Sequence, residues 1–326
     1  MVWQKGWMQK EAGDQGTFFD MAVAGRMSTN RVLEAINRLV NFTEAESILE
    51  ASYSALGRPA HRVPVMLRIV ILQHLYGLSD PQAEEQLRDR LSFQKFVGLS
   101  AQEVVPDETA ICRFRERLID CKLHEKLLGM LNGQLEAAGY LLKRTTLIDA
   151  TLIESSRKRP SSEAASEGRA PDADARYARK NGQNYYGYKA HVSVDGDHQF
   201  ICAAKATPAN VDDSKVFEKL IDPKTRATYA DKAYDSKANK AWLAAQGIAN
   251  GILKKGAHHI KLTPADLARN ARKTRRRCHI ERVFAHLKKW QHYRRARYLG
   301  LVKNQLELTL KAVTYNLKRL VTLAAA

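Results

Sequence analysis

The segment Arg277–Lys288 combines a carboxylate with two cations at spacings that bring them together on a helix. At about 100° per residue, Glu281 lies about 40° and Lys288 about 20° round the helix from Arg277. The apolar side chains that recur beside this line are Ile280, Val283, Leu287 and Trp290. They predict a helix that buries one side and keeps the charged line at the edge of the core. A carboxylate between two cations suits a site that handles metal and phosphate. The alternative is an ordinary basic helix whose Glu281 pairs with its neighbours.

Two aspartates upstream favour the metal interpretation. Asp149 lies in 145–153, a run rich in β-branched residues that predicts a strand buried on both faces, where an ionised carboxylate needs a cation. Asp231 stands at the expected end of a short strand, a place where α/β proteins put their chemistry, although a helix N-cap is an alternative role. Three carboxylates from two strands and a helix can hold two divalent cations, which activate a water or hydroxyl for phosphodiester displacement.

Asp149, Asp231 and the pattern Arg277-x3-Glu281-x6-Lys288 resemble the catalytic signature of DDE-type bacterial insertion-sequence transposases, in the insertion sequence 5 family of the insertion sequence 4 superfamily. The resemblance covers most of the chain from about Phe18 onward. The other segments that carry it are 78–96, Pro106–Thr109, Tyr186–His191 and Thr207–Val211. In one departure, this chain has Thr274 where the family pattern often has a Tyr that contacts a DNA phosphate.

The resemblance implies an enzyme that binds the terminal inverted repeats of an insertion sequence, cleaves at the element ends and transfers the 3′ hydroxyls to target DNA. Asp149, Asp231 and Glu281 would be both the catalytic residues and the ligands of two Mg²⁺ ions, with Mn²⁺ as a substitute. Arg277 and Lys288 would hold phosphates. The implied partners are double-stranded DNA and a second copy of the chain on DNA, with no membrane and no small-molecule cofactor. Two alternatives stay open, a ribonuclease-H-like nuclease without strand transfer and an inactive DNA-binding regulator.

Composition agrees with a polyanionic partner. The 326 residues carry a formal net charge of +18, and 44% of them are hydrophobic, enough for one or two well-packed domains. The four cysteines show no CxxC pairing and indicate reduced thiols rather than a zinc site or a disulfide framework. Neither a signal peptide nor a transmembrane run is recognised, so we expect a soluble, intracellular protein. The resemblance implies a bacterial cytoplasm and association with the nucleoid.

Composition and the helix and strand patterns divide the chain into three parts. Residues 1–60 form an N-terminal arm with a helix expected from Ser28 through Ala51, and 61–140 form an all-helical DNA-binding domain. Residues 141–326 form the catalytic domain, interrupted by a flexible insertion at 155–185 that lacks apolar residues and is expected to order on DNA.

In the helical domain the expected helices are 64–76, one capped near Ser79, one from Asp107 to Cys121 and one from Leu123 to Ala138. Arg113 and Arg117 lie one turn apart on the helix that begins after Asp107, and a DNA-reading face and a solvated basic face are equally compatible with them.

In the catalytic domain the expected strands are 145–153, 186–194, 199–206, a strand before Asp231, and 248–253. Helices are expected near 213–221 and 236–245, then the helix that carries Glu281, and a last helix with core residues at Val302, Leu306, Leu310, Val313, Leu317 and Leu320. Three strands, helix, strand, helix, strand, helix is the order of a ribonuclease-H-like fold. The fold class is therefore α/β, with a mixed five-stranded sheet and its helices preceded by the all-helical domain.

The remaining DNA-binding candidates are cations near the proposed catalytic helix and on the second strand. They are Arg276, Arg282, Lys289, Lys189 and His191. Lys189 and His191 alternate along one strand and so point to the same face, although a His there is more often structural. Trp290 lies in the apolar stripe and is expected in the core, although an aromatic residue in a basic cluster can stack on a displaced base.

Overall fold

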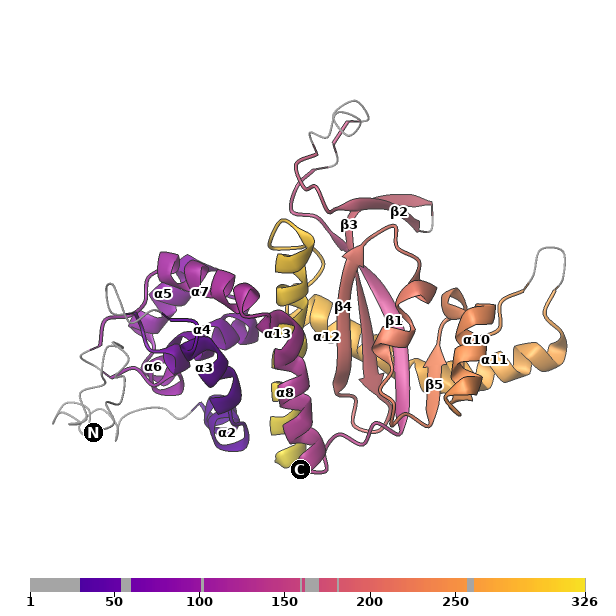
Figure 1. Cartoon of the computed structure of the whole chain (residues 1–326), viewed down its shortest axis with the longest axis horizontal. Helices are drawn as coiled ribbons and strands as arrows, with labels where there is room; N and C mark the ends of the chain where they lie inside the picture. Colours follow the sequence, from indigo (N-terminus) through magenta and orange to yellow (C-terminus); the bar gives the residue numbers. More distant parts are fainter. Residues whose placement is uncertain are drawn as a thin grey trace, which may run out of the picture. The chain divides into compact units, whose positions relative to one another are not determined.

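The computed structural model describes residues 30–53, 60–100, 103–158, 160–161, 170–180, 182–256 and 261–325. These residues form two compact units (Figure 1). Unit 1 comprises the described chain up to Leu123 together with the C-terminal end from Leu320, and unit 2 comprises His124–Arg319. The division falls at the start of the helix 123–137, whereas the sequence placed a boundary at 140, after it. None of the helices among the described residues combines the length and apolar character needed to cross a bilayer.

Unit 1 is helical. Its helices are α2 (Arg31–Leu39), α3 (Thr43–Glu50), α4 (Val63–Tyr76), α5 (Asp80–Asp89), α6 (Leu91–Val97) and α7 (Glu108–Asp120). Helix α4 is apolar on nearly every side. From Val63 to Leu75 only Pro64 and Arg68 are half-buried and the rest are buried, so the neighbouring helices pack around it. The expected caps are present, because Ser79 forms a capping box with Gln82 and the Asp107 carboxylate accepts from the amide of Ala110.

Unit 2 contains a six-stranded mixed sheet with helices on both faces. Its strands are β1 (Thr145–Glu154), β2 (Arg176–Lys180), β3 (Gln183–Asp195), β4 (Ile201–Pro208), β5 (Ala227–Ala230) and β6 (Ala249–Asn250). Its helices are α8 (Leu123–Ala137), α10 (Lys237–Ala245), α11 (Pro264–Arg277), α12 (His279–Trp290) and α13 (Leu301–Ala324), with short 3₁₀ turns η1 (Asp213–Val216), η2 (Glu218–Leu220) and η3 (Lys232–Tyr234).

The strand order is β4-β3-β1-β5-β6. Strands β1, β3 and β4 are antiparallel neighbours, and β5 runs parallel to β1, with Ile148 opposite Ala230. A meander of three strands followed by parallel strands on the other side of β1 is consistent with the predicted ribonuclease-H-like arrangement. Strand β2 is a sixth member that pairs with β3 beyond the end of β1.

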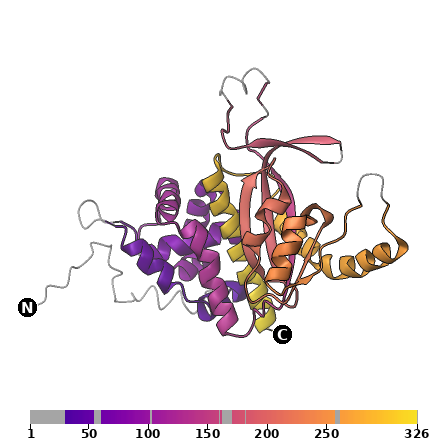
Figure 2. The same cartoon turned by 45° about the vertical axis from the view of Figure 1, so that its right-hand side comes forward.

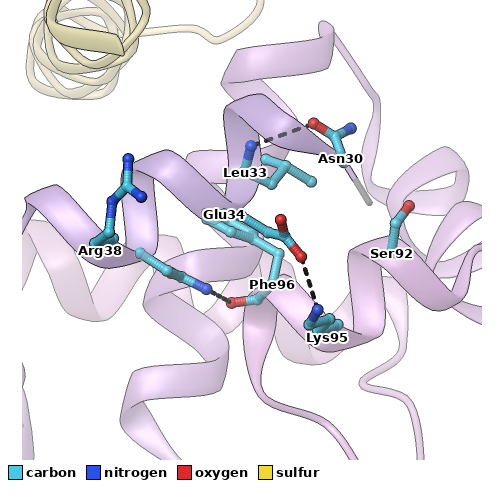
Figure 3. A pocket seen from close by; sticks show the side chains of 8 residues that line it. Asn30, Leu33, Glu34, Arg38, Ser92, Lys95 and Phe96 are labelled. Atoms are coloured by element: carbon cyan, nitrogen blue, oxygen red, sulfur yellow. Dashed lines mark hydrogen bonds and ion pairs between the residues drawn. The ribbon is translucent and has the colours of Figure 1, made fainter. Parts of the chain in front are cut away.

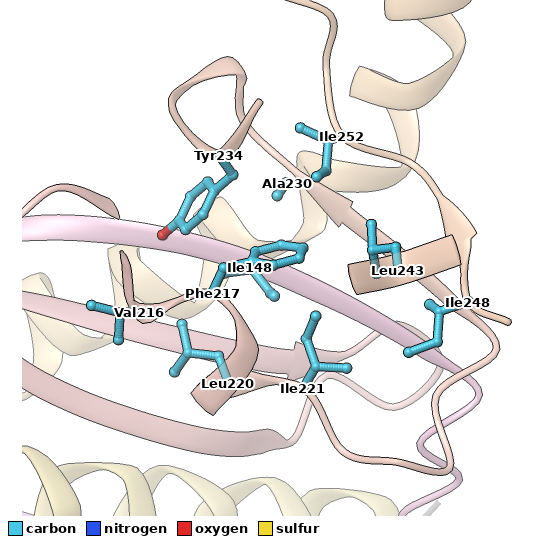
Figure 4. Packing of buried hydrophobic residues seen from close by; sticks show 10 residues of the cluster. All are labelled: Ile148, Val216, Phe217, Leu220, Ile221, Ala230, Tyr234, Leu243, Ile248 and Ile252. Atoms are coloured by element: carbon cyan, nitrogen blue, oxygen red, sulfur yellow. The ribbon is translucent and has the colours of Figure 1, made fainter. Parts of the chain in front are cut away.

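One face of the sheet is closed by an apolar cluster (Figure 4). Ile148 from β1 and Ala230 from β5 pack there against Phe217, Tyr234 and Leu243, which come from the turns around η1–η3 and from α10. Side chains alternate along a strand, so Asp149 points to the opposite face. On that face α12 packs against β1 and buries Ile280, Val283, Phe284 and Leu287.

The edge strand β4 is protected by amide side chains. Gln305 of α13 accepts from the amide of Ala206 and donates to the carbonyl of Ala204. Asn316 of α13 accepts from the amide of Ile201, and Asn132 of α8 donates to the same residue's carbonyl. These bonds occupy backbone groups that an edge strand otherwise offers to another chain.

Several sequence-based expectations need correction. The helix expected from Ser28 through Ala51 is two helices, α2 and α3, and Ser28 lies outside the described residues. The strand expected at 248–253 is reduced to two residues, and the helix expected at 213–221 consists of two 3₁₀ turns. In the last helix, Val302 is 47% exposed, whereas the other five predicted core residues are buried.

The predicted flexible insertion is partly regular. Strand β2 lies within it, and Asp172 is 2% exposed. The Asp172 carboxylate accepts from the hydroxyls of Ser155 at 2.7 Å and Tyr188 at 2.6 Å. The described part of 155–185 is therefore attached to the sheet. Residues 159, 162–169 and 181 of this segment lie outside the described residues.

Candidate active site

Asp149 and Asp231 lie on neighbouring parallel strands. Asp149 follows Ile148 in β1, and Asp231 follows Ala230, the residue opposite Ile148 in β5. Adjacent strands are about 4.8 Å apart, so the two aspartates stand side by side on the face that α12 covers. Asp231 also caps the 3₁₀ turn η3, since its carboxylate accepts from the amide of Lys232 at 2.7 Å. Asp231 therefore serves as the N-cap of η3 and also lies beside Asp149.

The Asp149 carboxylate is in an unfavourable place for a negative charge. Its side chain is only 23% exposed. Burial raises the pKa of Asp149, and the nearby charge of Asp231 raises it further, while the amide of Ala150 and the guanidinium of Arg277 act in the opposite direction. A second cation at this position would stabilise the paired carboxylates.

Arg277 connects Asp149 to Glu281. Its Nη1 donates to Asp149 Oδ2 at 2.9 Å, and its Nη2 donates to Glu281 Oε1 at 3.3 Å. The Arg277 side chain is 13% exposed, and its Nε is buried without a hydrogen-bond partner. The sequence predicted one continuous helix here, but α11 ends at Arg277 and α12 begins at His279. Arg277 and Glu281 nevertheless lie on a common side, as their spacing predicted, and they pair with each other, as the alternative of an ordinary basic helix expected.

The three carboxylates do not form a closed ligand set as they stand. Among the described residues, no three His, Cys, Asp or Glu side chains lie close enough together to hold a metal ion. The Arg277 guanidinium is bonded to both Asp149 and Glu281, and the Glu281 side chain is 63% exposed. Carboxylate oxygens are nevertheless the donors that Mg²⁺ and Mn²⁺ prefer. The three side chains therefore have the donor chemistry that such an ion needs.

Cations surround this pair of aspartates. Lys288 of α12 is half-buried, and burial lowers its pKa, as do the charges of Lys180 and Arg294, whereas Asp149 raises it. The charge of Lys180 also acts on Asp149. The charges of Lys288 and Asp149 therefore act on each other. Lys180 was missed because it falls in the segment predicted to be flexible; only the cluster of cations in 176–180 could have signalled it.

The other cations of the catalytic helices face solvent. Arg276, Arg282 and Lys289 are exposed. Arg276 lies over the ring of Tyr229, 5.8 Å from its centroid. Trp290 was expected in the core, but it is 62% exposed, with Lys289 Nζ 5.2 Å from its ring centroid. The expectation failed because α12 ends at Trp290, which places the ring beyond the packed part of the helix.

Lys189 and His191 do not line a DNA-facing surface. His191 is fully buried, its Nε2 is 2.9 Å from Thr207 Oγ1, and burial lowers its pKa to about 4. Lys189 donates to Asp213 at 2.8 Å and to the carbonyl of Val211 at 2.7 Å. Both side chains face the packed layer formed by η1, so their assignment as DNA contacts is wrong.

The two arginines of α7 that the sequence offered as DNA contacts differ in their surroundings. Arg113 is exposed. Arg117 donates to the carbonyl of Ser52 at 3.0 Å and lies over the ring of Tyr53, 3.8 Å from its centroid. Arg117 therefore joins α7 to the end of α3, whereas the assignment of Arg113 as a DNA contact stays a prediction.

A cavity of about 330 Å³ in unit 1 lies between α2 and α6 (Figure 3). Two of its charged residues, Glu34 and Lys95, pair with each other at 2.7 Å, and Asn37 donates to the carbonyl of Phe96. Among the residues described as lining it, the cavity has no pair of carboxylates comparable to Asp149 and Asp231.

Comparison with protein families agrees with this geometry. The family described as Transposase DDE domain matches residues 140–317, which is more than half of the 326-residue chain and contains all three carboxylates. The family described as Transposase domain (DUF772) matches residues 23–117, which include α2–α6 and most of α7. The chain belongs to the family of DDE-domain transposases.

Proposed function

We propose that the protein is the transposase of an insertion sequence of the insertion sequence 5 family. It binds the terminal inverted repeats, cleaves the DNA at the element ends and transfers the 3′ hydroxyls to target DNA. The observation that carries this proposal is the set of contacts on the sheet face that α12 covers. Asp149 and Asp231 stand side by side, Arg277 links Asp149 to Glu281, and Lys288 lies within electrostatic reach of Asp149.

Each side chain has a role that follows from its position. Asp149, Asp231 and Glu281 would hold two Mg²⁺ ions, which Mn²⁺ could replace. When bound, these ions activate a water or a 3′ hydroxyl and stabilise the leaving oxygen of the phosphodiester. In the free protein the Arg277 guanidinium is hydrogen-bonded to Asp149 and Glu281. When these carboxylates bind metal, the guanidinium would contact a DNA phosphate instead. This planar group suits bidentate contact with phosphate. Lys288 holds a neighbouring phosphate.

The partners of this reaction are two DNA duplexes and a second copy of the chain. A formal net charge of +18 favours association with DNA. Unit 1 contributes to recognition of the terminal repeats, with Arg113 as its exposed cation on α7. Two copies are needed to bring two element ends together, so we propose a homodimer on DNA that acts in the bacterial cytoplasm, at the nucleoid.

The first experiment separates binding from cleavage. Asp149→Asn removes a metal ligand and a negative charge near phosphate, so it should bind a terminal-repeat duplex at least as tightly as wild type while nicking is abolished. A gel shift and a Mg²⁺-dependent nicking assay on the same duplex measure both. Addition of target plasmid to pre-cleaved ends then tests strand transfer. Nicking by Asp149→Asn would refute the assignment of the catalytic residues, and cleavage without joining would identify a nuclease.

The second experiment tests the phosphate role of Lys288. Lys288→Ala should lower the slope of log affinity against log salt by about one unit. Lys289→Ala is the matched control, because Lys289 is about 100° round the same helix and its Nζ lies over Trp290. Equal losses in the two variants would indicate a diffuse basic surface in place of a defined contact.

A further inference from the structure

A cavity of about 300 Å³ lies at the end of β1, past the aspartate of the candidate active site. Its walls come from Glu154 and the residues that follow β1, from the β2–β3 hairpin, and from Arg295 in the loop after α12. Figures 1 and 2 show β2 turned across this end of the sheet. The volume is at the lower limit of small-molecule sites in proteins, so the cavity suits one group of about the size of a nucleotide.

The backbone around the cavity is fixed by close contacts. The amide of Glu154 donates to the carbonyl of Arg294 at 3.0 Å, and the amide of Ala296 donates to the carbonyl of Glu154 at 2.7 Å. On the hairpin side, a Cβ on Gly187 would lie 2.2 Å from the carbonyl oxygen of Ile153, so glycine permits the approach of β3 to β1. The cavity is therefore bounded by defined elements of the fold.

The cavity is positively charged. Arg157, Lys158 and Arg295 line it, and Glu154 is the one carboxylate among the described residues that do so. Three cations and one carboxylate give the lining a formal charge of +2. Like charges that share a cavity repel one another, and an anion between them removes that cost. The lining thus favours a ligand that carries negative charge.

The guanidinium of Arg295 is held in place at the cavity wall. Its Nε donates to the carbonyl of Ser155 at 3.1 Å, and its Nη2 donates to the carbonyl of Ser156 at 2.9 Å. Both acceptors are neutral, so they orient the guanidinium without cancelling its charge. An oriented guanidinium loses little further freedom when it binds an anion, and its planar shape matches phosphate.

The hairpin side of the cavity is aromatic. The rings of Tyr177 and Tyr186 pack at a centroid distance of 5.2 Å, and the Tyr186 hydroxyl donates to the carbonyl of Asp172 at 2.8 Å. Tyr186 is buried, whereas Tyr177 and Tyr185 are half-buried and keep part of their surface accessible. The Tyr185 hydroxyl donates to the side chain of Gln183 at 3.1 Å. Two tyrosine rings can therefore contact a ligand in the cavity.

Cations beside accessible aromatic rings are the combination that binds single-stranded nucleic acid. The cations hold the backbone, and every base has a face that can stack on a ring. A base within a duplex is already stacked and paired, so a duplex could use the cations of the cavity but not the tyrosines. The tyrosines therefore favour an unpaired nucleotide over a duplex.

The cavity is within reach of a DNA strand at the catalytic carboxylates. Glu154 follows Asp149 by five positions in β1 (154 minus 149), which is about 16 Å at a rise of about 3.3 Å per residue. Phosphates along one strand of a duplex are about 3.4 Å apart, so a strand at Asp149 reaches the cavity within about five nucleotides.

We propose that this cavity binds an unpaired nucleotide of a single DNA strand, with the base against Tyr177 and Tyr185 and the phosphate among Arg157, Lys158 and Arg295. The identification of the nucleic acid as DNA rests on the proposed function. The cavity adds to that function a site that holds one strand where the duplex opens near a cut.

The experiment uses a single-stranded oligonucleotide that contains 2-aminopurine, a base whose fluorescence falls when it stacks. Tyr185→Ala should weaken binding at least about fivefold and reduce the quenching at saturation, because it removes a stacking surface. Tyr185→Phe keeps the ring and should bind like wild type. Arg157→Ala should weaken binding and lower the slope of log affinity against log salt by about one unit.

Two controls show whether these losses belong to the cavity. Arg179 is an exposed cation of the same hairpin and is not among the described residues that line the cavity, so Arg179→Ala should lose less than half as much affinity as Arg157→Ala. On a blunt duplex of the same sequence, Tyr185→Ala should bind like wild type, whereas a misfolded variant would lose affinity for both DNAs. Arg157 is exposed, so its variant tests the cavity without disturbing the packing of the hairpin.

Three results would overturn the proposed site. They are unchanged affinity and quenching in Tyr185→Ala, an equal loss on the duplex in Tyr185→Ala, and equal losses for Arg157→Ala and Arg179→Ala. The proposed function fails separately. A protein that shows the single-strand effects but cleaves no terminal-repeat end would refute that function and leave the cavity assigned, and cleavage by a wild type whose Tyr185→Ala variant binds the single strand normally would refute the cavity alone.

Discussion

Arg277→Ala removes the cation that bridges Asp149 and Glu281, and its effect should depend on divalent metal. The hydrogen bond to Asp149 joins side chains that are 13% and 23% exposed, so it should contribute about 1.5–3 kcal/mol to the free energy of unfolding. The bond to Glu281 contributes less than about 0.5 kcal/mol, because that side chain is 63% exposed. Without metal we therefore expect a loss of about 2 kcal/mol, or about 4–8 °C in the melting temperature of a unit of this size.

Metal should restore the stability of Arg277→Ala. A ligand that binds only the folded state adds about 2.7 kcal/mol when its concentration is 100 times its dissociation constant. In the wild type the ion must displace Arg277, so the same Mn²⁺ concentration should stabilise wild type less than the variant. Thermal unfolding with and without Mn²⁺ measures both effects. Arg282→Ala is the matched control, because Arg282 is exposed on the next helical turn.

Two results would refute this reasoning. Arg277→Ala as stable as wild type without metal would show that the bond to Asp149 contributes nothing. Equal stabilisation of wild type and variant by Mn²⁺ would show that Arg277 does not compete for the metal ligands. Asp149→Asn in the Arg277→Ala background should abolish the Mn²⁺ effect, and its persistence would place the metal elsewhere.

Three further predictions concern the framework around the site. The pKa of His191 is lowered from 6.5 to about 4, so in acid the unfolded chain takes up the proton first. The free energy of unfolding should therefore fall by up to about 3 kcal/mol as pH drops from 6.5 to 4, and His191→Asn should remove this fall in pH-dependent denaturation curves. Gly187→Ala should displace β3 from the end of β1 and lower the melting temperature, because its Cβ would lie 2.2 Å from the carbonyl oxygen of Ile153, and an unchanged melting temperature would contradict this close approach. Asp172→Ala should cost roughly 3 kcal/mol in urea denaturation, since it leaves the buried hydroxyls of Ser155 and Tyr188 without their acceptor, and a loss below 0.5 kcal/mol would contradict the anchoring role.

The parts of the fold that follow local rules could be predicted from the sequence. The Ser79 and Asp107 caps were recognised from residue type and position, because an N-cap is satisfied within its own turn. The strand around Asp149 was recognised from its β-branched run. The core positions of α13 repeat at helical spacing, and all but Val302 are buried.

The parts that depend on tertiary contact could not be predicted in the same way. Strand β2 has the sequence Arg-Tyr-Ala-Arg-Lys, which shows no apolar alternation, and it exists because β3 extends beyond the end of β1. The burial of His191 depends on the turn η1, which no pattern places over β3. Trp290 fits the apolar stripe of α12, yet the helix ends there and its ring is exposed.

In the candidate site, too, the local features were predictable and the long-range contacts were not. The spacing of Arg277, Glu281 and Lys288 on a helix predicted their common side, and the structure brings Arg277 to both carboxylates. The break between α11 and α12 and the approach of Lys180 are long-range features. Neither has a periodic signal in the sequence.

The most direct test of the account is a crystal structure of the protein with a terminal-repeat DNA end and Mn²⁺, in which anomalous scattering locates the ions. We predict two ions about 3.5–4 Å apart, held by Asp149, Asp231 and Glu281, with Arg277 moved from the carboxylates to a phosphate. Ions coordinated without Glu281, or an Arg277 still bonded to Asp149 and Glu281 in the DNA-bound state, would contradict the central claim.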